Sequence, residues 1–186
     1  MNQTLHEYDQ VIAGCKALFL KKHQDYGSSW RILRPASITD QLYIKAKRIR
    51  SIEEKGVQQV EDGVDGEFMG LINYSIIALI QLEMEESDPL ELTAEEVEKR
   101  YDDKVAAVRT LMIQKNHDYG EVWREMRVSS MTDLILTKLL RIKQIEDNKG
   151  ATLVSEGVGP NYMDIINYAI FALIKLESTD TTGITN

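Results

Sequence analysis

The chain has 186 residues, enough for one large or two small domains, and 43% hydrophobic with 28% charged residues is ordinary globular composition. A formal net charge of −8 argues against duplex DNA or an anionic membrane as the primary partner, because both attract a net basic surface. The single cysteine, Cys15, excludes an intrachain disulfide and suits a reducing compartment, so we expect a cytoplasmic protein. Residues 1–10 are polar, and no apolar run approaches membrane-spanning length, so we expect neither a signal peptide nor a transmembrane helix.

One stretch of the sequence occurs twice. Residues 22–31 read Lys-His-Gln-Asp-Tyr-Gly-Ser-Ser-Trp-Arg, and residues 115–124 read Lys-Asn-His-Asp-Tyr-Gly-Glu-Val-Trp-Arg. The similarity continues beyond this stretch at a shift of about 93 positions, which indicates two copies of one unit. We expect a first helical repeat at 5–83, a linker at 84–92, a second repeat at 93–177 and a loose tail at 178–186.

Each repeat begins with an amphipathic helix that ends at the Asp-Tyr-Gly stretch. Gly27 and Gly120 are placed to end these helices, because glycine adopts the left-handed conformation after a helix without a Cβ penalty. Asp25 and Asp118 lie in the last turn, where the helix dipole disfavours a carboxylate by roughly 0.3–1 kcal/mol. A nearby lysine, a metal or a substrate therefore has to compensate for each aspartate.

The second helix of each repeat follows a short connector, 28–36 or 121–129. Ser37-x-x-Asp40 and Ser130-x-x-Asp133 are variants of the capping box and predict that these helices start there. This pattern already accounts for Asp40 and Asp133, so we interpret them as helix-start residues rather than ligands.

The third helix of each repeat is the most apolar and follows a glycine-containing loop, 55–66 or 148–160. Its wide apolar stripe predicts a central helix. Between the repeats, Thr93 and Glu96 form a capping box, with Leu92 and Val97 placed for a hydrophobic staple. We therefore predict an all-α protein in which tandem three-helix units form a pseudo-twofold helical bundle.

Several acidic and amide side chains point into the predicted bundle. The apolar face of the second helix extends onto Glu53 or Glu146, so each carboxylate faces inward or pairs with a neighbouring Lys or Arg. On the third helix, Asp164 and Asn167 lie one turn apart, and Asn73 corresponds to Asn167. Inward-facing carboxylates and amides are how bundles build oxygen-ligand metal sites. The two asparagines need hydrogen-bond partners and indicate a polar site within the bundle.

Basic and aromatic side chains recur in both copies. The cations Lys45, Arg48, Lys138 and Arg141 suit phosphate oxygens, although such residues most often form a solvated helix face. The rings of Tyr26, Trp30, Tyr119 and Trp123 suit either core packing or stacking on a base.

The pattern Lys-x-x-Asp-Tyr-Gly-x-x-Trp, a following Asp-x-x-x-x-Lys-x-x-Arg-Ile helix and a final Asp-x-x-Asn-Tyr helix together resemble a known family. It is the domain of unknown function 1599, also called nucleotide modification associated domain 1. This family is similar to the all-α nucleoside triphosphate pyrophosphatases that include the MazG proteins and dimeric dUTPases. The resemblance implies a Mg²⁺-dependent enzyme that cleaves a nucleoside triphosphate, canonical or modified, to the monophosphate and pyrophosphate.

The sequence departs from the pyrophosphatase pattern at its acidic residues. Those enzymes carry Glu-x-x-Glu on one helix and Glu-x-x-Asp on the next. The second helix here lacks the first pair, and the third reads Glu67-x-x-Gly70-x-x-Asn73 or Asn161-x-x-Asp164-x-x-Asn167. Because only the second copy keeps Asp164, we expect chemistry there first. With fewer carboxylates, a site either takes ligands from both repeats or lacks catalysis.

The first hypothesis, hydrolysis of a nucleoside triphosphate, assigns roles as follows. The expected catalytic residues are Glu146, Asp164, Lys138 and Arg141, and the expected Mg²⁺ ligands are Glu146, Asp164, Glu53 and Glu67. The expected substrate-binding residues are Lys115, Asp118, Tyr119, Trp123, Asn167, Lys22, Asp25, Tyr26, Trp30, Lys45, Arg48 and Asn73. The alternative hypotheses are a catalytically inactive module that binds nucleotides or a protein, and a purely structural bundle. The expected partner is a nucleotide, as substrate or ligand, and the sequence leaves open whether the chain forms a homo-oligomer.

Overall fold

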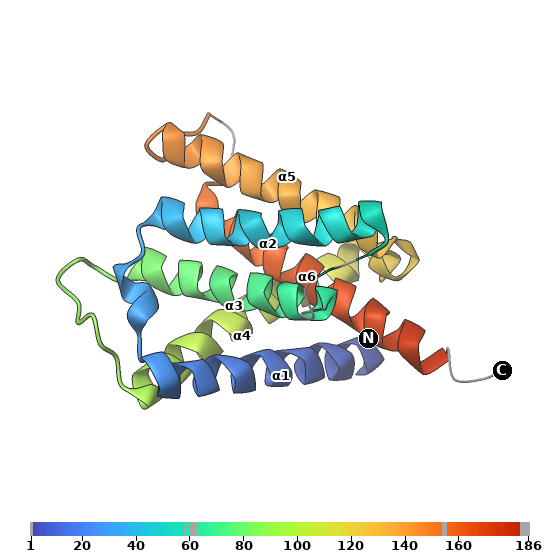
Figure 1. Cartoon of the computed structure of the whole chain (residues 1–186), viewed down its shortest axis with the longest axis horizontal. Coiled ribbons are helices and arrows are strands. Elements are labelled where there is room, and N and C mark those ends of the chain that lie inside the picture. The colour runs from blue at the N-terminus through green and yellow to red at the C-terminus, as the bar shows by residue number, and fades with distance from the viewer. Residues whose placement is uncertain (1, 58, 60–62, 154–155, 183–186) are drawn as a thin grey trace.

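The described part of the chain is entirely helical (Figure 1). A computed structural model describes residues 2–57, 59, 63–153 and 156–182. Within these ranges there are six α-helices, two 3₁₀ turns and no strand, which confirms the predicted all-α class. The elements are α1 (Asn2–Tyr26), η1 (Ser29–Ile32), α2 (Pro35–Lys55), α3 (Val64–Glu83), α4 (Ala94–Tyr119), η2 (Val122–Glu125), α5 (Val128–Asp147) and α6 (Val158–Thr182).

The helices form three layers, each made of one helix from each copy. In Figure 1, α2 and α5 lie at the top, α3 and α6 in the middle, and α1 and α4 at the bottom. The middle pair carries the most completely buried apolar side chains, among them Phe68, Leu71, Ile72, Ile76, Ile165, Ala169 and Ile170. The third helix of each repeat is therefore central, as its wide apolar stripe predicts.

Ion pairs relate the two copies by a pseudo-twofold axis. On the α1–α4 pair, Arg109 Nε lies 2.8 Å from Asp9 Oδ1, and Lys16 Nζ lies 2.8 Å from Asp102 Oδ1. Lys16 corresponds to Arg109, and Asp9 corresponds to Asp102. The same ion pair therefore occurs twice, once with the cation from the first copy and once with the cation from the second. The α2–α5 pair repeats this arrangement, with Lys143–Asp40 at 2.9 Å and Arg50–Asp133 at 3.2 Å. Both helix pairs are therefore antiparallel, and equivalent ends lie at opposite ends of the bundle.

Buried tyrosine–asparagine hydrogen bonds also cross between the copies. Tyr8 Oη donates to Asn167 Oδ1 at 2.9 Å, and Tyr101 Oη donates to Asn73 Oδ1 at 2.9 Å. The amide nitrogens donate to main-chain carbonyls of their own copy, at 3.0 Å to Cys15 O and 3.4 Å to Val108 O. The two asparagines thus have partners within the fold, and these partners join the repeats.

Two helices start earlier than predicted. α2 begins at Pro35 and α5 at Val128, rather than at the Ser-x-x-Asp patterns. Pro35 lies in the first turn, where its missing N–H costs nothing, and neither helix has a side-chain cap at its N-terminus. Asp40 and Asp133 instead pair with Lys143 and Arg50 of the other copy.

Of the other predicted helix ends, some are confirmed and others differ from the structure. The Thr93–Glu96 capping box at the start of α4 is confirmed, with both of its reciprocal hydrogen bonds present. α3 and α6 start at Val64 and Val158, ahead of their apolar stripes. The expected loose tail is wrong over its first part, because α6 continues to Thr182. The remaining residues, 183–186, lie outside the described ranges.

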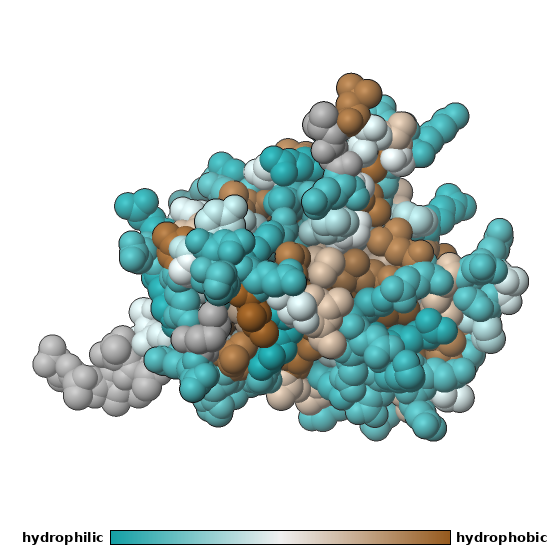
Figure 2. Space-filling model, turned by 180° about the vertical axis from the view of Figure 1, so that it is seen from behind, coloured by the Kyte–Doolittle hydropathy of each residue, from teal (hydrophilic) through white to brown (hydrophobic). Residues whose placement is uncertain are grey.

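The surface at the back of the molecule is mainly polar. Figure 2 shows the back of the molecule, where hydrophilic side chains cover most of the face and apolar ones gather in a central band. No described helix combines the length and the apolar composition that crossing a bilayer requires.

Candidate functional site

The Asp-Tyr-Gly stretch of the first copy forms a tight turn that the linker closes. Gly27 has φ +60°, and its N–H donates to His23 O at 2.8 Å, so the glycine ends α1 as predicted. The Glu91 carboxylate accepts a hydrogen bond from Ser28 N at 3.1 Å and lies where a Cβ at position 27 would be. Glycine is therefore favoured here by its positive φ, and a Cβ would also displace the Glu91 carboxylate.

A cavity of about 330 Å³ lies beside this turn, among the end of α1, η1, α2 and α3. Its size is at the lower end of the range for small-molecule sites, roughly 300–1,000 Å³. The lining combines aromatic rings with basic side chains: Phe19, Tyr26, Trp30, Tyr74, Lys22, His23 and Lys45. Five residues predicted to bind substrate, Lys22, Tyr26, Trp30, Lys45 and Asn73, therefore meet at one cavity.

Gly70 allows Lys45 to lie across α3 at the cavity. A Cβ at position 70 would approach Lys45 Cδ and Cε to 2.9 Å each. Lys45 Nζ lies 5.7 Å from the Tyr74 ring centroid and 3.4 Å from Glu67 Oε2. The other Glu67 oxygen pairs with Arg48 at 2.5 Å. Glu67 is thus engaged by two cations and does not face the cavity as a free carboxylate.

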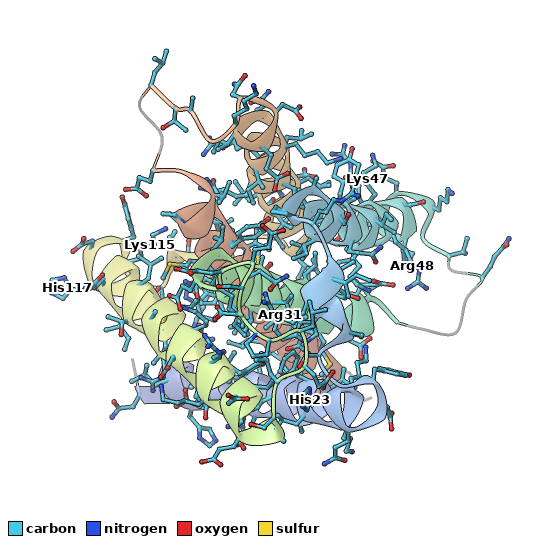
Figure 3. The ribbon with its side chains drawn as sticks, turned by 90° about the vertical axis from the view of Figure 1, so that its left-hand side faces the viewer. His23, Arg31, Lys47, Arg48, Lys115 and His117 are labelled. Atoms are coloured by element: carbon cyan, nitrogen blue, oxygen red, sulfur yellow. The ribbon has the colours of Figure 1, made fainter. Side chains whose placement is uncertain are left out.

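Two further basic side chains at the cavity lack partners in the described part of the chain. His23 Nδ1 is buried with no hydrogen-bond partner. Lys22 is exposed and makes no ion pair with a described residue. Figure 3 looks onto this end of the bundle, with His23 on α1 in the lower part of the view. Lys115 and His117, at the left of the view, lie near the end of α4, which runs antiparallel to α1. The first copy therefore offers cations with unused hydrogen-bonding capacity.

In the second copy, the equivalent positions are filled by the chain itself. Asp164 replaces Gly70, and its carboxylate lies 2.5 Å from Lys115 Nζ and 2.7 Å from Lys138 Nζ. The Trp123 ring stacks on Phe171, with centroids 4.2 Å apart and planes within 5°. Phe171 replaces Ile77 of the first copy. The cavity thus lies in the first copy, whereas the sequence, because of Asp164, places the expected site in the second copy.

Glu53 and Glu146 lie at opposite ends of the α2–α5 pair. Thr39 Oγ1 donates to Glu146 Oε1 at 2.7 Å, and Thr132 Oγ1 donates to Glu53 Oε1 at 2.8 Å. Burial raises the pKa of both carboxyls, and the threonine hydrogen bonds partly oppose it. The separation of Thr39 and Glu53 along α2 is roughly 20 Å at a rise of 1.5 Å per residue.

The expected Mg²⁺ ligands do not converge. Glu53 and Glu146 bond to threonines at opposite ends of α2–α5, and Glu67 and Asp164 are held by separate lysine or arginine pairs. Within the described ranges, no group of three or more His, Cys, Asp or Glu side chains is placed to hold a metal ion. The sequence pattern placed Glu53 and Glu146 on inward faces, and both are partly buried, but the antiparallel α2–α5 pairing puts them at opposite ends of the helix pair. This donor set does not fit Mg²⁺.

The remaining predicted residues lie away from the cavity. Asp118 Oδ1 is 3.0 Å from His117 Nδ1 on the surface, and Tyr119 is 74% exposed. Arg141 lines a separate surface pocket beside the loop before α6. Asp25 is exposed and does not line the cavity. Only the tyrosine and glycine of the Asp-Tyr-Gly stretch, in the first copy, border the cavity.

Three residues of this site are missing from the sequence-based predictions. His23 has no histidine at the equivalent position, Asn116, so comparison of the repeats gives no reason to select it. Tyr74 directly follows Asn73, and Gly70 interrupts an otherwise polar i, i+3, i+6 row on α3. For His23 and Gly70 the available signal was the difference between the copies, which have Asn116 and Asp164 at the equivalent positions, whereas Tyr74 is matched by Tyr168.

Fold and site together define a duplicated helical bundle with a basic, aromatic cavity in its first repeat. A family model for the nucleotide modification associated domain 1, the domain of unknown function 1599, matches residues 22–82 and again residues 115–176. The two segments cover most of the chain, so the protein belongs to this family. Both matches begin at the lysine that opens the repeated stretch. No curated protein and no solved structure matches the chain.

Proposed function

We propose that the protein binds a nucleotide in the cavity of the first repeat. The phosphates bind Lys22 and Lys45, and the base packs against Trp30 or Tyr74. The observation that carries this proposal is that aromatic rings and incompletely paired cations line one cavity of about 330 Å³. The family description, which associates the domain with nucleotide modification, supports the same class of ligand.

The chemistry of the lining favours a nucleotide over a purely apolar ligand. Stacking a base on an aromatic side chain contributes about 1–3 kcal/mol. Hydrogen bonds from lysine to a phosphate oxygen are charge-assisted and roughly twice as strong as neutral ones. Lys22 makes no ion pair with a described residue, and Lys45 shares the Glu67 carboxylate with Arg48, so both lysines at the cavity retain capacity to bind an anion.

Hydrolysis with Mg²⁺ remains a prediction of the family resemblance. The observation that favours it is Glu67, a carboxylate one helical turn from Gly70 that is held beside the cavity by Lys45. A single carboxylate engaged by two cations is a poor Mg²⁺ site, since charge on oxygen ligands sets the affinity for hard cations. We therefore propose binding that does not require a divalent metal, and leave turnover to experiment.

A nucleotide panel tests the proposal. Thermal shift and calorimetry with nucleosides and with mono-, di- and triphosphates, with and without Mg²⁺, are expected to show binding that needs a phosphate but no metal. Lys22→Ala is expected to weaken binding about tenfold, because it removes one charge-assisted hydrogen bond at a site with no folding role. Lys21→Ala is the matched control, since Lys21 is an exposed neighbour that does not line the cavity. Equal effects of the two variants, or no binding at all, would overturn the proposal.

The same samples test the hydrolase hypothesis. It predicts pyrophosphate release that requires Mg²⁺ and is lost in Asp164→Ala. Binding without chemistry predicts no release from either protein. A broad screen without any thermal response would instead support the structural interpretation of the bundle.

A further inference from the structure

The two repeats differ at the positions that face the ligand cavity. On α3 the first repeat has Gly70 and Ile77, and on α6 the second repeat has Asp164 and Phe171 at the equivalent positions. In the second repeat, these side chains bring a carboxylate to two lysines and a flat ring to a tryptophan. A nucleotide would bring the same two groups, an anion and a ring, to the first repeat.

We infer that the second repeat is closed by an internal mimic of the ligand. The Asp164 carboxylate takes the place of a phosphate between Lys115 and Lys138, and Phe171 takes the place of the base against Trp123. The inference rests on the proposed function, because it assumes that the equivalent cavity of the first repeat binds a nucleotide. It predicts one ligand per chain, bound in the first repeat.

The contacts of Asp164 explain why an external anion does not displace it. The side chain is 13% exposed, and Lys138 is 18% exposed, so the pair is largely shielded from solvent. A phosphate entering between the same lysines would meet the carboxylate, and like charges at such short range repel strongly. Because Asp164 belongs to the chain, its carboxylate is always present at high effective concentration.

The aromatic end of the second repeat is closed in the same way. Phe171 lies parallel to Trp123, and the Arg124 guanidinium lies 4.3 Å from the Trp123 ring centroid. Trp123 is therefore already covered where a base would stack. In the first repeat, Trp30 and Ile77 both line the cavity instead.

Gly70 is the feature that keeps the first repeat open. The three atoms nearest to a Cβ at this position belong to the flexible end of Lys45, so a side chain here displaces that end first. Aspartate is also better tolerated than glycine within a helix. Gly70→Asp is therefore expected to fold and to place a carboxylate beside Lys45 and Lys22, as Asp164 lies beside Lys138 and Lys115.

Calorimetric stoichiometry with the best-binding nucleotide of the panel tests the inference. We expect one site in the wild-type chain, no detectable binding in Gly70→Asp, and retained binding in Gly70→Ala, which adds a Cβ without a charge. Loss in both Gly70 variants, or retention in both, would contradict the role of the carboxylate.

The reciprocal variant asks whether the second repeat opens. Asp164→Ala with Phe171→Ile gives the second repeat small side chains at both closed positions, and two sites per chain are expected. Adding Gly70→Asp to this variant is expected to return the count to one, now in the second repeat. Circular dichroism and melting curves monitor folding, and Asp164→Asn, which keeps the shape of the side chain, replaces Asp164→Ala if the latter unfolds.

The outcomes separate this inference from the proposed function. A wild-type chain that binds no nucleotide overturns the proposed function. A wild-type chain with one site, and no second site in the opened variant, overturns the mimic alone. Two sites in the wild-type chain also overturn the mimic, since the second repeat would then be open.

Discussion

The two repeats are alike where they hold the bundle together and different where they face a cavity. The tyrosine–asparagine hydrogen bonds and the interhelical ion pairs occur in both orientations across the pseudo-twofold axis. By contrast, the positions at the cavity differ: Gly70 of the first repeat corresponds to Asp164 of the second, and Ile77 corresponds to Phe171. A side chain that contacts the other repeat is constrained by the packing of both repeats. A side chain at a cavity is constrained only locally, so one site can close while the fold is kept.

The largest expected difference concerns the two tryptophans. Trp30→Ala and Trp123→Ala each remove a buried indole, which costs about 3–5 kcal/mol of unfolding free energy. Trp123→Ala is expected to cost about 0.5–1.5 kcal/mol more, because it also removes the stack on Phe171. Urea denaturation of the ligand-free variants measures both losses.

Phenylalanine at the same positions is the control for this comparison. Trp123→Phe keeps a ring against Phe171 and is expected to lose less than Trp123→Ala. A greater loss from Trp30→Ala than from Trp123→Ala would contradict the picture of an open and a closed repeat.

The next prediction concerns the buried hydrogen bonds that both repeats share, rather than the cavity positions at which the repeats differ. Tyr8→Phe and Tyr101→Phe each leave a buried asparagine oxygen without its donor, which costs about 1–3 kcal/mol. The two losses are expected to be equal, because the contacts are equivalent. Thermal or urea unfolding measures them. Tyr26→Phe, at a largely exposed ring, is the control and is expected to change stability by less than about 0.5 kcal/mol. Clearly unequal losses would show that the two halves of the core do not contribute alike.

The smallest predicted effect is a pH dependence shared by Glu53 and Glu146. Burial raises the pKa of each carboxyl above its unfolded value of 4.5, so the folded state holds these protons more tightly than the unfolded state does. Their contribution to stability is therefore complete below pH 4.5 and is lost as pH rises through the folded pKa. Glu53→Gln and Glu146→Gln are expected to gain stability relative to wild type over that rise, since glutamine can still accept from the threonine.

Denaturant unfolding from pH 4 upward follows this difference. Glu54→Gln is the matched control, because the Arg50 hydrogen bond lowers the pKa of Glu54 and gives it the opposite sign. A Glu146→Gln protein that loses stability relative to wild type as pH rises would refute the assignment of burial as the dominant cause.

Sequence patterns predicted the elements of this fold well because their causes are local. The apolar spacing gave the helices, and the Thr93–Glu96 capping box gave the start of α4, since both depend on residues within a few positions. The starts of α2 and α5 were missed because Ser-x-x-Asp resembles a cap. Asp40 and Asp133 instead pair with Lys143 and Arg50, which lie 103 and 83 residues away in the sequence, and a local pattern cannot detect such partners.

For a related reason, the structure brings some of the predicted site residues together and leaves the others apart. Lys22, Tyr26, Trp30, Lys45 and Asn73 were selected from one repeated pattern, and they do meet at a cavity. Their second-copy equivalents were selected from the same pattern, and chemistry was expected first in the second copy because it keeps Asp164. The copies differ because the Asp164 carboxylate lies between Lys115 and Lys138 in the second copy, where the first copy has Gly70. The position of Asp164 relative to these lysines depends on how α4, α5 and α6 pack.

The sequence by itself determined the helical class, the two copies and their repeated Asp-Tyr-Gly stretch, since periodicity and internal similarity are properties of the chain alone. Only the tertiary structure decided that Glu53 and Glu146 lie apart, that Asn73 and Asn167 bond across the repeats, and that the cavity lies in the first copy. The physical reason is that antiparallel pairing of the copies places each inward-facing polar group against a residue of the other copy, and this pairing follows from the packing of whole helices.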